Sequence, residues 1–232
     1  MHYLVAGRQK WNRQHFSEVL SGCEGTWDFC ESPDELEQQL NSGVDYRYVF
    51  FLHWSHVVDD QLLAKSECVC FHLTDVPYGR GGSPLQNLIA RGHRDTKLTA
   101  LRMTSELDAG PVYMKVDLSL EGGTAEEIYQ RASRLSCELA REIAETEPDP
   151  VDQCGDIITF RRRQPGESEV PESCKSLEQL FDHIRMLDAA GYPRAFILSG
   201  GFRVEFSRAA LYHGHIKADV KVTVTRPDIG NE

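Results

Sequence analysis

The first 75 residues alternate short apolar runs with polar segments of helical character. The apolar runs fall at residues 2–6, 26–30, 46–52 and 67–72, and a segment that can form a helix separates each run from the next. This order is typical of βαβ units, in which helices join parallel strands and cover the sheet. It predicts an α/β fold with a Rossmann-like, mostly parallel sheet and helices on both faces.

Capping residues set the start of two of the expected helices. Ser32 can cap a helix whose first residue is Pro33, and Glu35 can complete a capping box. A second box, formed by Thr124 and Glu127, opens a helix that is expected to end near residue 146.

The rest of the chain divides at an acidic, proline-containing stretch. Residues 145–152 are the best linker candidate, so we expect a larger, Rossmann-like domain at 1–150 and a small α+β subdomain at 151–232. The glycine- and proline-rich stretch 74–84 is expected to be an irregular functional loop. Further strands are expected at 97–103, 112–116, 157–160 and within 194–224, and helices at 85–91 and 176–189.

Charge and hydropathy narrow the range of partners. The chain has 25 Lys and Arg against 36 Asp and Glu, a net charge of −11, which disfavours nucleic acids and anionic lipids as partners. The apolar run at 48–54 is far shorter than the roughly 20 residues that cross a bilayer. Seven cysteines without a Cys-x-x-Cys pair indicate reduced thiols and a cytoplasmic protein.

One histidine stands where open parallel sheets bind their ligands. His72 ends a predicted strand and precedes the glycine-rich loop, which places it beyond the carboxyl end of the sheet. A histidine there can exchange a proton near neutral pH. Asp108, in a turn after a later strand, could orient this ring and stabilise its charged form, although for these two residues alone a packed histidine and a surface aspartate are the more common explanation.

Three motif pieces give this pair a more specific meaning. They are Cys70-Phe71-His72, the loop at 76–84 with the sequence VPYGRGGSP, and Leu107-Asp108-Ala109-Gly110. In their order and spacing they resemble the formyltransferase family that uses 10-formyltetrahydrofolate. The resemblance covers about residues 44–144 and implies the formyltransferase fold, an N-formyltransferase activity, 10-formyltetrahydrofolate as cosubstrate and no metal.

The resemblance also implies a role for each matching residue. His72 would be the general acid and base, and Asp108 would orient it. The pterin ring of the cosubstrate would be held by His56, Val57, Val58, Thr104, Ser105, Glu106, Leu107 and Asp108. The substrate side would be formed by Tyr78, Arg80, Gly81, Gly82 and Asn87.

Cys70 departs from the family pattern. The family carries an asparagine at this position, whose amide would donate a hydrogen bond to the tetrahedral oxyanion, and a thiol is a poor donor. Loss of such a donor costs about a hundredfold to a thousandfold in rate unless another group replaces it. The candidates for replacement are a backbone N–H of Gly81 or Gly82, the His72 ring and the Asn87 amide; otherwise the chain binds without turnover.

A zinc site is the alternative explanation for the thiols of this strand. Cys68, Cys70 and His72 alternate along it and could face one side. Small thiols also pack well in a buried parallel strand, and structural zinc takes four ligands, so no metal is predicted.

The acceptor is inferred from two longer stretches. Residues 71–87 are similar to short nucleotide-sugar N-formyltransferases of the pseudaminic-acid branch, which act on a UDP-linked 4-amino-4,6-dideoxy sugar. Residues 184–196 are similar to the C-terminal part of sugar formyltransferases, which makes Arg185 and Tyr192 substrate-side candidates. The sequence thus predicts a UDP-linked amino sugar as acceptor and leaves a homodimer possible. The alternatives are a non-catalytic folate- or nucleotide-sugar-binding protein, or a formyltransferase for a free amino acid or a tRNA-linked amine.

Overall fold

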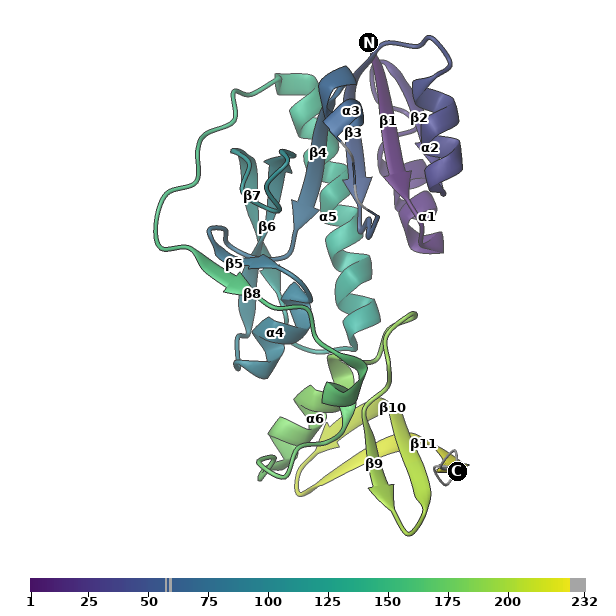
Figure 1. The fold of residues 1–232 in the computed structure, drawn as a ribbon, viewed down its shortest axis with the longest axis vertical. Helices are drawn as coiled ribbons and strands as arrows, with labels where there is room; N and C mark the ends of the chain where they lie inside the picture. Colours follow the sequence, from purple (N-terminus) through teal and green to yellow (C-terminus); the bar gives the residue numbers. More distant parts are fainter. Residues whose placement is uncertain (57, 59, 226–232) are drawn as a thin grey trace, which may run out of the picture. The chain divides into compact units, whose positions relative to one another are not determined.

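The computed structural model describes residues 1–56, 58 and 60–225 (Figure 1). Its largest element is a six-stranded sheet in the order β2-β1-β3-β4-β6-β7. The first four of these strands are parallel, and β6 and β7 are antiparallel to their neighbours. The predicted α/β, mostly parallel architecture is confirmed. The strands are β1 (His2–Gly7), β2 (Thr26–Cys30), β3 (Tyr46–Leu52), β4 (Glu67–His72), β6 (Asp95–Arg102) and β7 (Val112–Ser119).

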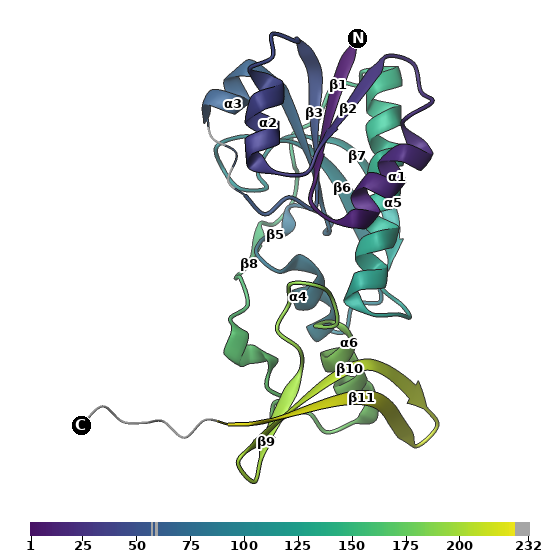
Figure 2. The ribbon, with the colours of Figure 1, turned by 90° about the vertical axis from the view of Figure 1, so that its right-hand side faces the viewer.

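Helices cover both faces of this sheet, as Figure 2 shows: α2 and α3 lie on one side, and α1 and α5 on the other. Ser32 caps α2 by accepting the N–H of Glu35 at 3.2 Å, as predicted, but the Glu35 carboxylate accepts the N–H of Glu31 at 2.7 Å. The box of Thr124 and Glu127 forms at the start of α5. The helices are α1 (Lys10–Val19), α2 (Pro33–Leu40), α3 (Asp60–Lys65) and α5 (Ala125–Thr146).

The core follows from strand alternation, because neighbouring residues of a strand point to opposite faces. On one face, Cys68 of β4 packs in a cluster with Val49 and Phe51 of β3 and Leu36 of α2. On the other face, Tyr3 of β1 donates to the carbonyl of Ala144 in α5. Both faces of the central strands are therefore buried, which explains why their sequences are continuous apolar runs.

The loop at 74–84 is more regular than predicted. It contains β5 (Tyr78–Gly81), which pairs in parallel with β8 (Ile158–Phe160). The expectation of an irregular loop was wrong because the partner strand comes from a part of the chain about eighty residues later, which local sequence patterns do not reveal. This pairing gives the glycine-rich segment a fixed course next to His72.

The described chain forms two compact units that are interleaved along the sequence. The N-terminal unit comprises 1–84, 95–119 and 129–161, and the C-terminal unit comprises 85–94, 120–128 and the residues from 162 onward. The division into domains at 1–150 and 151–232 stays a prediction. Within the described chain, no helix is both long and apolar enough to cross a membrane.

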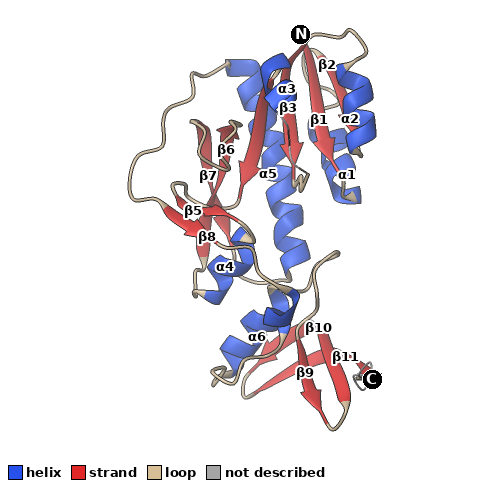
Figure 3. Cartoon of the chain, in the orientation of Figure 1, coloured by secondary structure: helices blue, strands red, loops and turns tan. Residues whose placement is uncertain are grey.

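The C-terminal unit contains a three-stranded antiparallel sheet in the order β11-β10-β9, drawn in red in Figure 3. This confirms the predicted small α+β appendage. Its elements are α4 (Pro84–Ala90), the 3-10 helix η1 (Pro165–Ser168), α6 (Leu177–Arg185), β9 (Phe196–Ser199), β10 (Phe202–Tyr212) and β11 (His215–Val224).

Candidate active site

His72 is the last residue of β4, and its ring is buried. Its Nε2 lies 2.8 Å from the carbonyl oxygen of Gly79 in β5. A carbonyl oxygen only accepts hydrogen bonds, so Nε2 carries a proton and donates it to Gly79. The nitrogen at which the neutral ring has a free electron pair is therefore Nδ1.

Asp108 faces that second nitrogen. Its Oδ1 lies 3.5 Å from His72 Nδ1, and its Oδ2 accepts the backbone N–H of Gly81 at 2.9 Å. Asp108 lies in the turn between β6 and β7 with a φ of 54°, in the left-handed region. A proton on His72 Nδ1 would thus lie between the imidazole and a carboxylate that β5 holds in place.

Gln153 fixes the turn that carries Asp108. Its side-chain amide donates to the carbonyl oxygens of Asp108 and Gly110, each at 2.8 Å. Gln153 could not be identified from the sequence, because no local signal distinguishes a glutamine that follows an acidic linker. Its contribution depends on a long-range contact.

Two glycines allow this close packing. A Cβ on Gly81 would lie 2.4 Å from the carbonyl oxygen of Phe160, and one on Gly110 would lie 1.8 Å from that of Arg102. Any larger residue at either position would push apart the loops that carry Gly81 and Asp108. Gly81 and Gly110 of the predicted motifs therefore allow close backbone-to-backbone packing in this structure.

Cys70 is half-buried and packs against the apolar cluster around Cys68. Burial, with a smaller contribution from the charge of Asp108, raises the pKa of the Cys70 thiol. The group is a neutral thiol at physiological pH and can offer only a weak S–H donor. The position of the family asparagine thus holds no strong hydrogen-bond donor in this chain.

Two of the proposed replacements for that asparagine are already engaged. The N–H of Gly81 donates to Asp108, and the N–H of Gly82 donates to the carbonyl of Phe160 at 3.0 Å. The idea that either amide is a ready oxyanion donor is therefore corrected. The neutral His72 ring is engaged as well, because its Nε2 proton is donated to the Gly79 carbonyl and its Nδ1 faces Asp108.

The alternating thiols of β4 contribute to packing. Cys68 is buried in the apolar cluster that it shares with Leu4 and Cys30. In residues 1–56, 58 and 60–225, no group of three or more His, Cys, Asp or Glu side chains could hold a metal ion.

The segments expected to hold the pterin lie in loops. Residues 104–107 are exposed after β6, and the Thr104 hydroxyl donates to the Glu106 carbonyl at 3.1 Å. The exposed His56 ring contacts Arg8 Nη1 at 2.8 Å, and Val58 packs at the border of the apolar cluster. Val57 lies outside the described residues. Exposed loop backbone of this kind can bind a planar heterocycle by its N–H and C=O groups.

Arg80 is less available to a substrate than expected. Its side chain is only 12% exposed and lies 3.6 Å from a carboxylate oxygen of Glu106. Its Nε also donates to Gln153 Oε1 at 3.0 Å. These contacts indicate that Arg80 supports the turn of Asp108, while Tyr78 packs edge-on against Phe160.

Three predicted substrate-side residues belong to the C-terminal unit. Arg185 is buried and donates to the carbonyl of Leu120 at 2.8 Å and to Asp182 at 2.6 Å. Asn87 is buried and its amide oxygen accepts from Arg91 at 2.9 Å, while Tyr192 is half-buried. The described hydrogen bonds of Arg185 join α6 to Leu120 within its own unit, which is a structural role, and its part in substrate binding stays a prediction.

Known proteins of similar sequence and structure share this architecture. Residues 165–223 match the family described as "Methionyl-tRNA formyltransferase, C-terminal domain". A methionyl-tRNA formyltransferase from Bacillus mycoides is 25% identical over 175 residues, covering 72% of this chain and 54% of that protein. Another from Rickettsia massiliae is 33% identical over 102 residues, which are 43% of this chain and 34% of that protein. The chain spans about a third to a half of the length of these curated relatives.

Solved structures extend the comparison. HypX from Aquifex aeolicus, in complex with tetrahydrofolic acid, has a TM-score of 0.72 at 15% identity over 89% of this chain and 37% of that chain. A 4-N formyltransferase from Francisella tularensis has a TM-score of 0.67 at 13% identity over 94% of this chain and 96% of that chain. At these identities the likeness concerns the fold alone.

A methionyl-tRNA formyltransferase from Clostridium thermocellum is far more similar. Its structure superimposes with a TM-score of 0.90 at 39% identity, over 97% of this chain and 99% of that chain. Together with the His72–Asp108 pair at the end of β4, this agreement over nearly the whole length shows that the chain belongs to the formyltransferase family.

Proposed function

We propose that this protein transfers a formyl group from 10-formyltetrahydrofolate to a primary amine. The observation that carries the proposal is the pairing of His72 Nδ1 with Asp108 at 3.5 Å in a chain of this family. In the transfer, the amine nitrogen bonds to the formyl carbon and the bond from that carbon to the folate nitrogen breaks. The amine loses one proton, which His72 accepts at Nδ1, and the folate nitrogen gains one.

Asp108 would act as a positioning residue for this proton. Because Nε2 is committed to the Gly79 carbonyl, a protonated ring has its second N–H directed at the carboxylate. The charge that His72 gains during the reaction is then balanced by a carboxylate that is itself held by the Gly81 N–H. A protein with the same fold, HypX from Aquifex aeolicus, has been solved in complex with tetrahydrofolic acid, which supports a folate as the formyl donor.

For the acceptor, the comparisons favour a tRNA-linked amine, the predicted alternative, over the nucleotide-linked sugar. The relatives named above at 25–39% identity are methionyl-tRNA formyltransferases, while the likeness to the sugar enzyme concerns the fold alone. The C-terminal segment that suggested a sugar enzyme matches a methionyl-tRNA formyltransferase domain instead. We therefore propose methionyl-tRNA as the first acceptor to test.

One observation keeps a UDP-linked amino sugar as the second candidate. The chain has a net charge of −11, and an acidic protein gains little from the phosphates of an RNA. A small acceptor does not require a long basic surface.

A comparison of three acceptors, each supplied separately, tests the proposal. The purified chain is incubated with 10-formyltetrahydrofolate and either methionyl-tRNA, a UDP-linked 4-amino-4,6-dideoxy sugar or a free amino acid. Release of tetrahydrofolate and the gain of one formyl mass on the acceptor are measured together. We expect turnover with methionyl-tRNA, and none in the His72→Asn variant. Turnover with the sugar alone would reverse the choice of acceptor, and calorimetric binding of folate without any product would show a binding protein without activity.

A further inference from the structure

The three-stranded sheet of the C-terminal unit ends in a long open edge. The strand order is β11-β10-β9. Among the described residues, β11 therefore pairs with β10 on one side and with no strand on the other. β11 runs from His215 to Val224 without a proline. A strand of this length with a row of unpaired N–H and C=O groups is a template for pairing with another strand.

One face of this sheet is apolar and exposed. The even-numbered residues of β11, from 216 to 224, are Ile, Ala, Val, Val and Val, and the odd-numbered ones are polar. Val220, Val222 and Val224 are 54%, 56% and 71% exposed, and Phe202 of β10, the partner of Val224, is 47% exposed. Apolar side chains gathered in this way mark an interaction surface.

In β11 the backbone N–H and C=O groups of the even-numbered residues point toward the open edge of the sheet. Thr225, just after the strand, donates its N–H to Gly201 on the β10 side at 2.9 Å. Hydrogen-bonding direction alternates along a strand, so the odd-numbered residues of β11 face β10 and the even-numbered ones face outward. The outward donors and acceptors therefore belong to the same residues that form the apolar face.

We infer that β11 pairs with β11 of a second copy of this chain, antiparallel, about a twofold axis through Val220. In this register Val220 faces its own counterpart and Val222 faces Ala218 of the second copy. Even-numbered residues always meet even-numbered residues, so the two apolar faces join on one side of a continuous six-stranded sheet. Each outward N–H meets an outward C=O.

Charge and the length of the apolar row together specify this register. Asp219 and Lys221 lie on the polar face, on either side of Val220. A twofold axis at Val220 places Asp219 of each copy directly opposite Lys221 of the other, in a non-hydrogen-bonded pair where side chains approach closely. Moving the axis by two residues toward Val222 would place Lys221 opposite Thr223 and lose both pairs. Moving it by two residues toward Ala218 would pair Asp219 with Lys217, but would place Val222 opposite Gly214 in the turn and Val224 beyond β11 of the second copy.

The test begins with the mass of the full chain in solution. We expect sedimentation velocity to show a species of twice the 26.3 kDa chain mass that dissociates on dilution. A monomer at all concentrations up to hundreds of micromolar overturns the inference.

Cross-linking then tests the register. Val220→Cys should form a disulfide between copies under mild oxidation, because the twofold axis brings the two positions to the distance of a strand pair. Val224→Cys is the matched control: it has the same chemistry and face but meets Ile216 of the second copy, so it should not cross-link with itself. The parent chain with its seven cysteines sets the background. Equal cross-linking of both variants, or of neither, overturns the register.

Charge reversal separates contacts between copies from contacts within one. Asp219→Lys and Lys221→Asp each place like charges opposite one another in their own dimers, and each should weaken dimerisation about tenfold. Mixing the two variants restores both opposite-charge pairs, so the mixed dimer should be stronger than either parent. Each substitution also disturbs an ion pair within its own chain, Asp219 with Arg208 or Lys221 with Glu205. Mixing does not restore these pairs, so a gain on mixing reports contacts between copies. If mixing gives no gain, the proposed pairing is wrong.

Discussion

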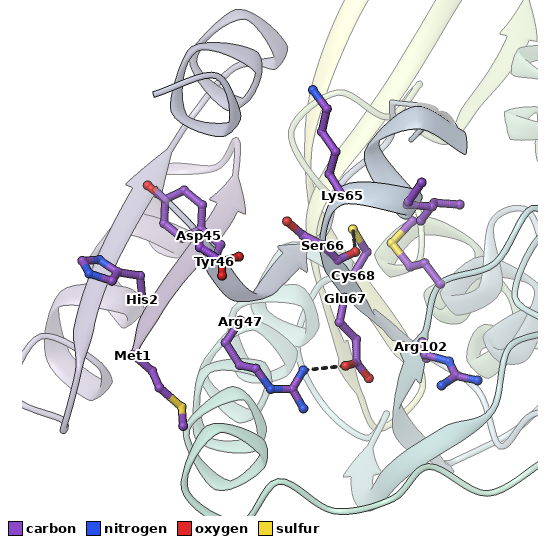
Figure 4. Close-up of a pocket in the computed structure, with 13 residues that line it drawn as sticks. Met1, His2, Asp45, Tyr46, Arg47, Lys65, Ser66, Glu67, Cys68 and Arg102 are labelled. Atoms are coloured by element: carbon purple, nitrogen blue, oxygen red, sulfur yellow. Dashed lines mark hydrogen bonds and ion pairs between the residues drawn. The ribbon is translucent and has the colours of Figure 1, made fainter. Parts of the chain in front are cut away.

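The two ends of β4 carry charged clusters of different character. At its first residue, Glu67 accepts from Arg47 at 2.5 Å and also from the hydroxyl of Tyr113. Arg47 in turn stacks 4.0 Å from the ring of Tyr48 (Figure 4 shows the Arg47–Glu67 pair). At the last residue, His72 and Asp108 stand 3.5 Å apart. The first cluster is held by short hydrogen bonds, whereas the two side chains of the second are further apart.

The groups at the first end of β4 do not change their protonation state near neutral pH. Burial opposes ionisation of Glu67, yet the hydrogen bonds from Tyr113 and Arg47 hold the pKa of its carboxyl below the usual value. Burial and the bond to Glu67 raise the pKa of Tyr113. Both groups keep one protonation state at neutral pH, so this end of the strand cannot exchange protons during a reaction.

The closed cluster nevertheless lies beside a cavity of about 760 Å³, lined by residues such as Lys65, Arg102 and Met103 (Figure 4). His72 and Asp108 do not line it. The comparison teaches that a hollow alone does not indicate chemistry: a reactive site also needs a group that can change its protonation state.

The largest expected effect is that of His72→Asn. This change should lower formyl transfer by about a thousandfold, because the amine proton loses its acceptor. Single-turnover release of tetrahydrofolate measures it, and the far-ultraviolet circular dichroism should match that of the parent. A variant that keeps a tenth or more of the activity would remove His72 from the mechanism.

Asp108→Asn should lower the rate on the order of a hundredfold, since a neutral amide can accept the Gly81 N–H but cannot balance the charge on His72. The pH–rate profile should shift, which a purely structural role would not produce. Asp117→Asn is the matched control, because this aspartate is 89% exposed and its described ion pair is with Lys97, outside the proposed site. Equal losses in both variants would argue against a specific role of Asp108.

At the closed end of β4, Tyr113→Phe should cost stability and not catalysis. Removing the hydroxyl leaves Glu67 with one partner fewer, and we expect a loss of about 2 kcal/mol in the free energy of unfolding. Urea denaturation measures it. A large fall in kcat at unchanged stability would mean that the two ends of β4 are coupled.

His53, just after β3, predicts a dependence of stability on pH. Burial lowers its pKa to about 4, from the 6.5 expected in the unfolded chain. The unfolded state therefore binds the proton first as the pH falls, and roughly 2 kcal/mol of stability should be lost between pH 7 and pH 5. His53→Asn, which tolerates the φ of 49° at this position, should flatten the profile. Identical profiles for the two proteins would exclude this origin.

The smallest expected effect is a gain. Cys70→Asn restores the family residue next to His72 and should raise kcat, by up to about tenfold, if the position lies near the oxyanion. Cys70→Ser is the control for volume and polarity. If the Asn variant is no faster than the Ser variant, the oxyanion is stabilised by a group other than the side chain at position 70.

Much of the fold is local in origin and could therefore be predicted. The strands at 26–30, 46–52 and 67–72 and the caps of α2 and α5 depend on apolar runs and on side chains within four residues. The pairing of β5 with β8 could not be predicted, because β5 has a broken local pattern and its partner lies far along the chain. The same reason explains why Gln153 was missed.

The sequence by itself determined the parallel sheet, the position of His72 at the end of a strand, and the amphipathic alternation of β11, since each follows from the order of side chains along a short segment. Only the tertiary structure decided which atoms of that site are free to act. It committed Nε2 of His72 to Gly79 and the N–H groups of Gly81 and Gly82 to Asp108 and Phe160. Hydrogen bonds join groups that are distant in sequence, and each donor proton, once engaged, is no longer available for another partner.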